Sequence, residues 1–381
     1  MMRAAMKRQK PRAVAGPDVL AKDVQRLSRL LTRDREDLPH AYLRDEGLRH
    51  AYLHYYLPAN SAKVHLPLRE LSLHPAGLLE RERLRVLDLG SGPGTAILGI
   101  LAHFQTGKYR PALEFTGVDH VAENLDAAQE LFREQSRGYP APAGLSTLQR
   151  TISGMMAGLE GPYDIIVLSN VLNELFPGEE RRTFARVEIV NALLTGVLAD
   201  DGSCVLIEPA LRETSREMLL VRDGLIERGF TVYSPCLMQE HCPALVNPKD
   251  WCHEDIPWTA PDLVREIDRL TGLRKDALKF SYCVLRKHGR SLADVRGRDA
   301  LRVVSEPLVT KGKTELYVCG SGGRRIAMRQ DKERSEANAA FDQLRRGAVA
   351  WFENLVPEEK RYRVRKDTRV TLLSLPGGKH P

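Results

Sequence analysis

Six short apolar runs, separated by stretches with helical spacing, dominate the middle of this 381-residue chain. The runs occupy residues 85–90, 114–120, 163–170, 202–209, 230–235 and 279–287. Strands that are apolar along their whole length are typical of a parallel sheet with helices on both faces. The alternation therefore predicts an α/β domain with a Rossmann-like parallel sheet over residues 81–288.

The segments on either side of this domain have different patterns. Residues 1–80 place apolar groups at three- and four-residue spacings, which predicts a helical amino-terminal region that is interrupted at Pro58. Residues 291–381 carry short strand-like runs separated by turns, which predicts a small antiparallel β-barrel of the oligonucleotide-binding kind. Within the middle domain, residues 137–146 have the composition of a linker.

A glycine-rich turn follows the first apolar run. Residues 86–95 read Val-Leu-Asp-Leu-Gly-Ser-Gly-Pro-Gly-Thr, a strand that leads into a tight turn and then into a helix. Glycine lets the chain turn sharply and lets a ligand approach the backbone. Thr95 replaces the last glycine of the dinucleotide fingerprint, and Pro93 removes an amide that could hold a pyrophosphate. A nucleoside without phosphate therefore fits this turn better than NAD or FAD.

An acidic residue, Asp119, ends the second run, where a carboxylate can accept hydrogen bonds from both ribose hydroxyls. Together with the glycine turn, it resembles the class I S-adenosylmethionine-dependent methyltransferases. The resemblance implies that the turn lines the methionine of the cofactor and that Asp119 holds its ribose. The predicted cofactor-binding residues are Asp88, Gly90, Gly92, Gly94, Asp119 and Asn170. The alternative is a fold of this class that no longer binds the cofactor.

Three polar residues, Asn170, Asn173 and Glu174, end or follow the run at 163–170. That position is the carboxyl edge of the predicted sheet, where α/β folds bind ligands, so these residues are candidates for catalysis or substrate contact. The alternative is that they begin a solvated helix. They do not form the Asn/Asp-Pro-Pro-aromatic signature of amine methylases, and no cysteine stands where a C5-pyrimidine methylase needs its nucleophile. No general base is assigned, and enzymatic activity stays open.

Four of the six cysteines gather near the end of the α/β domain. Cys236, Cys242, Cys252 and Cys283 are separated by gaps of 5, 9 and 30 residues. Disulfides are rare in reducing compartments, so four thiolates that converge on a metal would order this segment, and residues 233–283 are predicted to form a metal-binding insert. Zinc and an iron–sulfur cluster both accept four cysteine ligands, whereas the alternative is a set of buried apolar thiols.

The remaining cysteines and two nearby histidines have separate interpretations. Cys204 and Cys319 lie inside other predicted strands and are interpreted as small buried apolar side chains. His241 and His253 neighbour the cysteine series and could replace one cysteine as a metal ligand.

The cysteine series also carries a family resemblance. With the class I core, the run Ser-Asn-Val-Leu-Asn-Glu-Leu at 169–175 and Phe-Ser-Tyr-Cys at 280–283, it resembles mitochondrial small-ribosomal-subunit assembly factors, the family of methyltransferase-like protein seventeen and its bacterial relatives. The resemblance implies a 4Fe-4S cluster on the four cysteines, S-adenosylmethionine at the glycine turn and binding to small-subunit ribosomal RNA. It also implies an assembly factor rather than a proven methylase.

Positive charge is concentrated near the carboxyl end of the chain. The whole chain has a net charge of +7, but residues 286–381 hold 22 Lys and Arg against 12 Asp and Glu, so this part carries +10 and the rest −3. Such a local field indicates a polyanionic partner, with nucleic acid favoured over an anionic membrane surface and a merely soluble surface as the alternative. The predicted RNA contacts are Arg324, Arg325 and Arg329.

Composition and the amino-terminal segment limit the cellular compartments in which the protein can be expected. With 43% hydrophobic and 28% charged residues, disorder throughout the chain is excluded. No apolar stretch approaches the roughly 18 to 20 residues that cross a bilayer. The start is basic and lacks an apolar segment, so a mitochondrial transit peptide is the alternative to an uncleaved cytoplasmic start. We expect a cytoplasmic monomer, or a protein of the mitochondrial matrix if the source is eukaryotic.

Three functions remain in view. The first is an assembly factor of the small ribosomal subunit that binds ribosomal RNA through a methyltransferase-like domain stabilised by an iron–sulfur cluster. The second is an active ribosomal RNA methyltransferase in which a flipped base meets the methyl donor beside Asn170. The third is a small-molecule methyltransferase whose basic tail is incidental.

Overall fold

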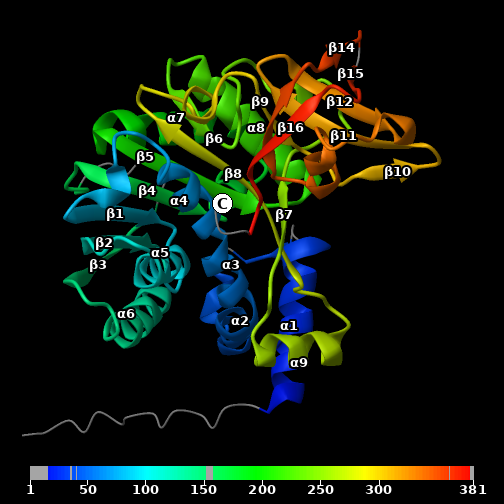
Figure 1. Ribbon diagram of the computed structural model, residues 1–381. Helices are drawn as coiled ribbons and strands as arrows, with labels where there is room; N and C mark the ends of the chain where they lie inside the picture. The colour runs from blue at the N-terminus through cyan, green and yellow to red at the C-terminus, as the bar shows by residue number, and fades with distance from the viewer. Residues whose placement is uncertain (1–15, 35–36, 40, 152–157, 360, 378–381) are drawn as a thin grey trace, which may run out of the picture. The chain divides into compact units, whose positions relative to one another are not determined.

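The computed structural model describes residues 16–34, 37–39, 41–151, 158–359 and 361–377 (Figure 1). It forms two compact units, Met1–Pro58 with Ala260–Lys275, and Ala59–Thr259 with Asp276–Pro381. This division differs from the predicted boundary at residue 80, because the chain from Ala59 onward groups with the α/β sheet and a later helix groups with the amino-terminal helices. The predicted transit-peptide segment lies largely outside the described residues.

The first unit is helical, as the spacing of its apolar residues predicts. Its main helices are α1 (Pro17–Thr32), α2 (Glu46–Ala51) and α9 (Asp262–Thr271). Helix α1 buries Val24 and Leu27, and α9 buries Val264 and Ile267, each on a single face. The Tyr55 hydroxyl donates a hydrogen bond of 2.5 Å to the carboxylate of Asp268, so a segment near residue 55 and one near 268 complete a common core.

The predicted helix interruption at Pro58 is wrong. Helical backbone continues from α2 through Tyr52–Tyr56 into α3 (Leu57–Lys63). The turn before the proline is π-helical, and the Leu57 N–H donates to the carbonyl of Tyr52 five residues earlier. This wider turn changes the hydrogen-bond ladder just where Pro58 has no N–H to donate, so the helix passes through the proline.

The second unit contains the predicted Rossmann-like sheet. Its strand order is β3-β2-β1-β4-β5-β8-β6, with β7 also paired to β8. The strands are β1 (Arg83–Leu89), β2 (Ala112–Asp119), β3 (Ala143–Gln149), β4 (Tyr163–Ser169), β5 (Leu198–Pro209), β6 (Thr231–Ser234), β7 (Glu254–Pro257) and β8 (Ala277–Arg286). Strands β1 to β5 pair in parallel, whereas β8 is antiparallel to β5, β6 and β7. All six predicted strands are present, and the predicted linker at 137–146 instead leads into the edge strand β3.

Helices cover both faces of this sheet (Figure 1). They are α4 (His65–Leu71), α5 (Thr95–Thr106), α6 (Ala122–Ser136), α7 (Arg182–Gly196) and α8 (Arg212–Ile226). Helices α5 and α6 lie on one face, and α7 and α8 lie on the other. The strand order reverses beside β1, which pairs with both β2 and β4, so the carboxyl ends of β1 and β4 mark the position where α/β sheets of this kind bind ligands.

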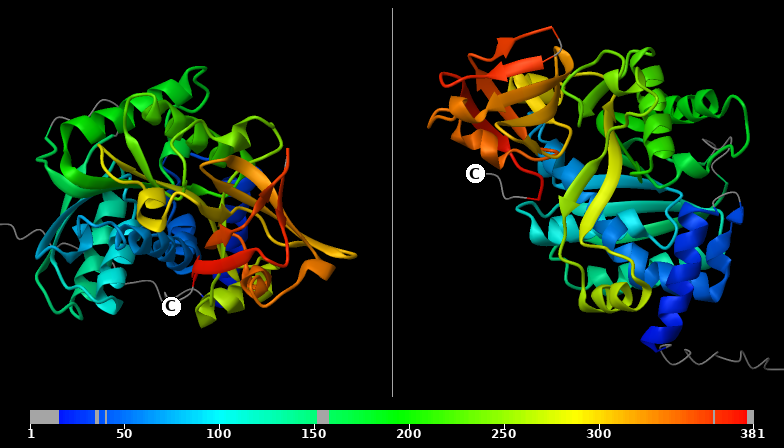
Figure 2. Two further views of the ribbon diagram at one scale, coloured as in Figure 1. Left: turned by 45° about the horizontal axis from the view of Figure 1, so that its top comes forward. Right: turned by 90° about the vertical axis from the view of Figure 1, so that its right-hand side faces the viewer.

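The carboxyl-terminal part of the same unit is a second sheet, which curls into a half-barrel (Figure 2). It follows α10 (Leu292–Arg296) and has the order β14-β15-β12-β11-β9-β13-β16, with β10 paired to β11. The strands are β9 (Ala300–Val303), β10 (Leu308–Thr310), β11 (Lys313–Gly320), β12 (Gly323–Gln330), β13 (Val349–Glu353), β14 (Val356–Pro357), β15 (Arg361–Val364) and β16 (Arg369–Ser374). The barrel-like prediction is confirmed, but the sheet is not purely antiparallel because β12 and β15 pair in parallel.

A buried ionic cluster joins this half-barrel to the rest of the second unit. The Arg302 guanidinium on β9 binds the carboxylate of Glu70 on α4 and lies 3.5 Å from the Glu254 carboxylate on β7. The Tyr282 hydroxyl donates a 2.5 Å hydrogen bond to the other oxygen of Glu70. All four side chains are buried, so each depends on the others for its polar partners.

We predict that Glu70→Ala lowers the free energy of unfolding by about 3 to 5 kcal/mol. The substitution leaves the buried Arg302 guanidinium with the more distant Glu254 carboxylate, at 3.5 Å, as its remaining anionic partner in this cluster. Urea unfolding followed by circular dichroism measures the change. The control is Glu353→Ala, which removes an exposed pair with Arg369 and should cost less than about 1 kcal/mol. Equal, small effects of the two substitutions would contradict the role given to Glu70.

Candidate functional site

The glycine turn lies at the carboxyl end of β1. Gly90, Gly92 and Gly94 have φ values of +67°, +52° and +79°, a region that L side chains rarely adopt. A Cβ atom added to Gly92 would meet nothing within 4 Å, whereas one added to Gly94 would lie 3.1 Å from the Ala128 side chain on α6. Gly92 therefore borders open space, and Gly94 allows close packing of the turn against a helix.

Asp119, at the end of β2, is bonded directly to this turn. One carboxylate oxygen accepts a 2.9 Å hydrogen bond from the Gly92 N–H. The other accepts hydrogen bonds from the Val121 N–H at 2.9 Å and the Asn124 amide at 3.2 Å. The structure thus brings together two residues predicted from separate motifs, and the carboxylate fixes the turn against the second strand.

Asp88 lies beneath the same turn and is buried. Neither of its carboxylate oxygens has a hydrogen-bond partner among the described residues, and the same is true of the Ser91 hydroxyl. Burial, together with the nearby Asp119 carboxylate, raises the pKa of Asp88 to about 7. The turn therefore contains buried polar groups whose hydrogen-bonding capacity is unused.

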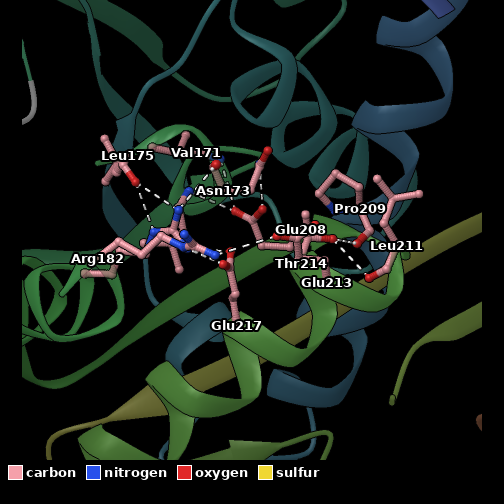
Figure 3. Close-up of polar contacts among 12 residues, drawn as sticks. Val171, Asn173, Leu175, Arg182, Glu208, Pro209, Leu211, Glu213, Thr214 and Glu217 are labelled. Atoms are coloured by element: carbon pink, nitrogen blue, oxygen red, sulfur yellow. Dashed lines mark hydrogen bonds and ion pairs between the residues drawn. The ribbon is translucent and has the colours of Figure 1, made fainter. Parts of the chain in front are cut away.

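The end of β4 is held by Glu208 from β5 (Figure 3). One oxygen of this buried carboxylate accepts hydrogen bonds from the N–H groups of Val171 at 3.1 Å and Leu172 at 2.9 Å. The other accepts a 2.6 Å hydrogen bond from the side-chain amide of Asn173. Asn173, a predicted catalytic candidate, is thus engaged in holding its own loop. The candidates Asn170 and Glu174 are partly exposed, and Asn170 has a φ of +58°.

Two arginines and a glutamate support this loop from α7 and α8. Buried Arg186 donates to the Leu175 carbonyl at 2.9 Å and to the Glu217 carboxylate at 2.6 Å. Arg182 donates to the other oxygen of Glu217 at 2.7 Å. None of these three residues was predicted from the sequence, since a charged residue in a helical pattern usually indicates a solvated face.

The predicted metal ligands line one cavity of about 50 Å³ in the second unit. Cys236, Cys242 and Cys252 reach it from the segment after β6, and Cys283 reaches it from β8. His253 also lines this cavity, and burial lowers its pKa to about 4. Among the described residues, no set of three or more His, Cys, Asp or Glu side chains is arranged so that it could hold a metal ion. The cavity therefore collects the thiols without forming a metal site in their present orientation.

The two remaining cysteines differ from each other. Cys204 is buried in the core against β4 and β8, as predicted for a small apolar side chain. Cys319, on β11, lines the cavity with the four cysteines of the series, so its interpretation as a mere packing residue is incomplete. Burial, followed by the proximity of other cysteines, raises the pKa of Cys242, Cys252 and Cys319 to about 12. Although Arg222 and Arg324 lie nearby, thiols with so high a pKa are neutral at pH 7 unless a bound metal ion displaces the proton.

The predicted RNA-contacting arginines are bonded within the protein. The prediction of a surface contact is wrong for Arg329, which is 1% exposed, binds the Asp342 carboxylate and donates to the Asn338 carbonyl at 3.1 Å. Arg324 forms a 2.7 Å ion pair with Asp250. Arg325 donates to two backbone carbonyls, at 3.1 Å and 3.0 Å, from residues 358 and 359.

We predict that stability responds to pH through Glu208. Burial raises its pKa to about 7, so the folded protein binds a proton more tightly than the unfolded chain does, and the associated stability is lost as pH rises from about 4 through 7. Glu208→Gln keeps an acceptor for the backbone N–H groups and should gain up to about 3 kcal/mol relative to wild type between pH 5 and pH 8. Urea unfolding across this range tests the prediction, with Glu353→Gln as an exposed control. A difference that does not vary with pH would contradict it.

Several solved structures resemble this chain at low sequence identity. The plantazolicin methyltransferase BpumL in complex with SAH is 10% identical, with a TM-score of 0.34, over 72% of this chain and 98% of that one. A Listeria monocytogenes protein, lmo1582, assigned to class I S-adenosylmethionine-dependent methyltransferases, is 12% identical, with a TM-score of 0.38, over 71% and 80%. The CurJ carbon methyltransferase is 21% identical, with a TM-score of 0.35, over 72% and 68%. A search of curated proteins found no match.

A family comparison is more specific. The model of a family described as "Mitochondrial small ribosomal subunit Rsm22" matches residues 48–341, about three quarters of the chain. The matched segment begins in α2 and ends in the half-barrel, so it includes the glycine turn and all five cysteines of the cavity. The chain, with its Rossmann-like sheet, therefore belongs to the Rsm22 family.

Proposed function

We propose that this protein is an assembly factor of the small ribosomal subunit that binds ribosomal RNA. The observation that carries the proposal is the family match over residues 48–341, since the name of that family refers to the mitochondrial small ribosomal subunit. The net charge of +10 in residues 286–381 supports a polyanionic partner. We further propose that the protein acts as a monomer, in the mitochondrial matrix of a eukaryote or the cytoplasm of a bacterium. No helix of the described part of the chain is long and apolar enough to cross a membrane.

The glycine turn is proposed to bind S-adenosylmethionine. The residues that would hold it are Asp88, Gly90, Gly92, Gly94, Asp119 and Asn170. They fit a nucleoside ligand because the space beside Gly92 is open and buried polar atoms at Asp88 and Ser91 lack partners among the described residues. When bound, the cofactor supplies an activated methyl group, and the chain's own contribution is to fix the turn through the Asp119 carboxylate.

We expect Gly92→Val to weaken binding of S-adenosylmethionine by at least about tenfold, because a branched side chain would fill the open space of the turn. Isothermal titration calorimetry measures the affinity. Gly229→Val is the matched control, since Gly229 also has a positive φ and open space around its Cβ position but lies after α8. If both variants bind like wild type, the cofactor site has been misplaced.

The cysteine cavity is proposed to hold a 4Fe-4S cluster on Cys236, Cys242, Cys252 and Cys283, with zinc as the alternative. Thiolates are the donors that both centres prefer, and all four side chains line one cavity. The donor set therefore fits in kind. The described residues do not form a metal site as they stand, so binding would require the thiols to move closer together. A bound centre would cross-link the segment after β6 to β8 and make the insert rigid.

For RNA, four exposed cations of the half-barrel replace the three bonded arginines as the proposed contacts. We call them the basic rim, and they are Lys311, Lys332, Arg365 and Lys366. Two hydrogen bonds from backbone N–H groups join the three turns that carry these cations. The Asp331 N–H donates to the Gly312 carbonyl at 2.9 Å, and the Lys366 N–H donates to the Glu333 carboxylate at 3.1 Å. A cluster of this kind suits phosphate contacts, which position RNA without reading its sequence.

Replacing the basic rim with four alanines should weaken binding to small-subunit ribosomal RNA and reduce the slope of log affinity against log salt by about 3. Filter binding at several salt concentrations measures both quantities. The control replaces Lys108, Arg110, Arg133 and Arg137, four exposed cations near α5 and α6, and so makes the same change in net charge. Equal losses in the two variants would show that net charge, rather than the rim, governs binding.

A ribosomal RNA methyltransferase is the second candidate function. The observation that favours it is the left-handed backbone of Asn170 at the carboxyl end of β4, because strained residues often occur at active sites. Asn173 is less suited to catalysis, since its side chain already binds Glu208. Mass spectrometry of ribosomal RNA from deletion and wild-type cells separates the two functions, because a single missing methyl mark would favour the enzyme.

A further inference from the structure

The cysteine cavity has walls from two parts of the second unit. Most of its lining comes from α8, β8 and the segment after β6, but Arg302, Val304, Cys319 and Arg324 come from the half-barrel. The Cys319 sulfur lies 3.7 Å from the Met238 sulfur on the opposite side. A group that fills the cavity would therefore contact both parts at once.

Cys319 is a fifth sulfur that the four-cysteine series does not include. It stands on β11, where it pairs with Arg302 of β9 and with Arg324 of β12 in the sheet register. Its neighbours along the sheet thus also line the cavity. This arrangement places the Cys319 thiol beside Arg324 on the half-barrel side of the cavity, opposite the thiols of the insert. The Arg324 guanidinium also forms the 2.7 Å ion pair with Asp250.

Arg222 gives an independent indication that the cavity takes an anionic group. Its guanidinium is buried, donates to the Met238 carbonyl at 2.8 Å and pairs with Asp223 at 2.5 Å. Its Nε–H nevertheless has no partner among the described residues, although Arg222 lines the cavity. A buried cation with an unused donor favours a negatively charged ligand, as a thiolate-bound metal centre is.

We propose that Cys319 and Arg324 contact the metal centre from the half-barrel side, so that filling the cavity stabilises the docking of the half-barrel on the cysteine insert. This inference rests on the proposed metal centre and extends it to the RNA-binding part of the chain. A ligand that contacts both parts binds the docked state better than an undocked one, and by linkage it stabilises that state. Loading of the cavity would then fix the position of the basic rim relative to the insert.

Hydrogen exchange on the full-length protein tests the proposal, with the chain compared before and after anaerobic reconstitution with iron and sulfide. Loading should slow exchange of amides in β11 and β12 by about tenfold or more, as well as in the insert. Cys319→Ala should reduce this slowing in β11 and β12. Arg324→Gln should reduce it more than Asp250→Asn does, since the latter removes the carboxylate of the Arg324–Asp250 ion pair but keeps the guanidinium beside the cavity. Cys204→Ala is the matched control, since its thiol lies in the core outside the cavity lining, and it should respond like wild type.

The outcomes separate this proposal from the metal centre itself. If the wild-type chain loads iron and only the insert is protected, the coupling to the half-barrel is overturned and the metal centre stands. If Cys319→Ala and Arg324→Gln both respond like Cys204→Ala, the role of the half-barrel side is overturned. A wild-type chain that takes up neither iron with sulfide nor zinc would overturn both proposals. Exchange of the unloaded variants shows whether they fold like wild type.

Discussion

Arg302 is the side chain on which the arrangement of the second unit depends. It is 3% exposed, and its guanidinium meets carboxylates from α4 and from β7, two elements separated by most of the α/β sheet in sequence. A buried cation needs such partners, because leaving it unpaired costs several kcal/mol. Arg302 and Glu254 also line the cysteine cavity, so the same ion pairs that join the half-barrel to the sheet also form part of the wall of that cavity.

The local patterns of the sequence predict the α/β fold and the glycine turn after the first strand. Each of the six predicted strands and the positive φ values at Gly90, Gly92 and Gly94 follow from short-range signals, and these signals are independent of the rest of the chain. The edge strand β3 is not predicted, because none of its residues is fully buried and its Gly and Ser residues are also common in turns. The helix continues through Pro58 because of a π-helical turn that the sequence does not predict.

The candidate sites were harder to predict where they depend on tertiary contacts. The sequence near Asn173 does not indicate that its side-chain amide donates a hydrogen bond to a glutamate on the next strand. The sequence near Arg329 likewise does not indicate that Asp342 and Asn338 are its partners. The four-cysteine series did identify the thiols that share a cavity. The sequence favours a packing role for Cys319 because its strand lies outside that series, and only the sheet register places it beside Arg324.

The helical unit is discontinuous in sequence, and this has a consequence for synthesis. Helix α1 buries Val24 and Leu27, while the helix that completes this unit, α9, begins only at Asp262. Domains generally form as units while the chain emerges from the ribosome. The apolar face that α1 presents to α9 therefore has no covering partner from α9 until the chain has been synthesised as far as Thr271.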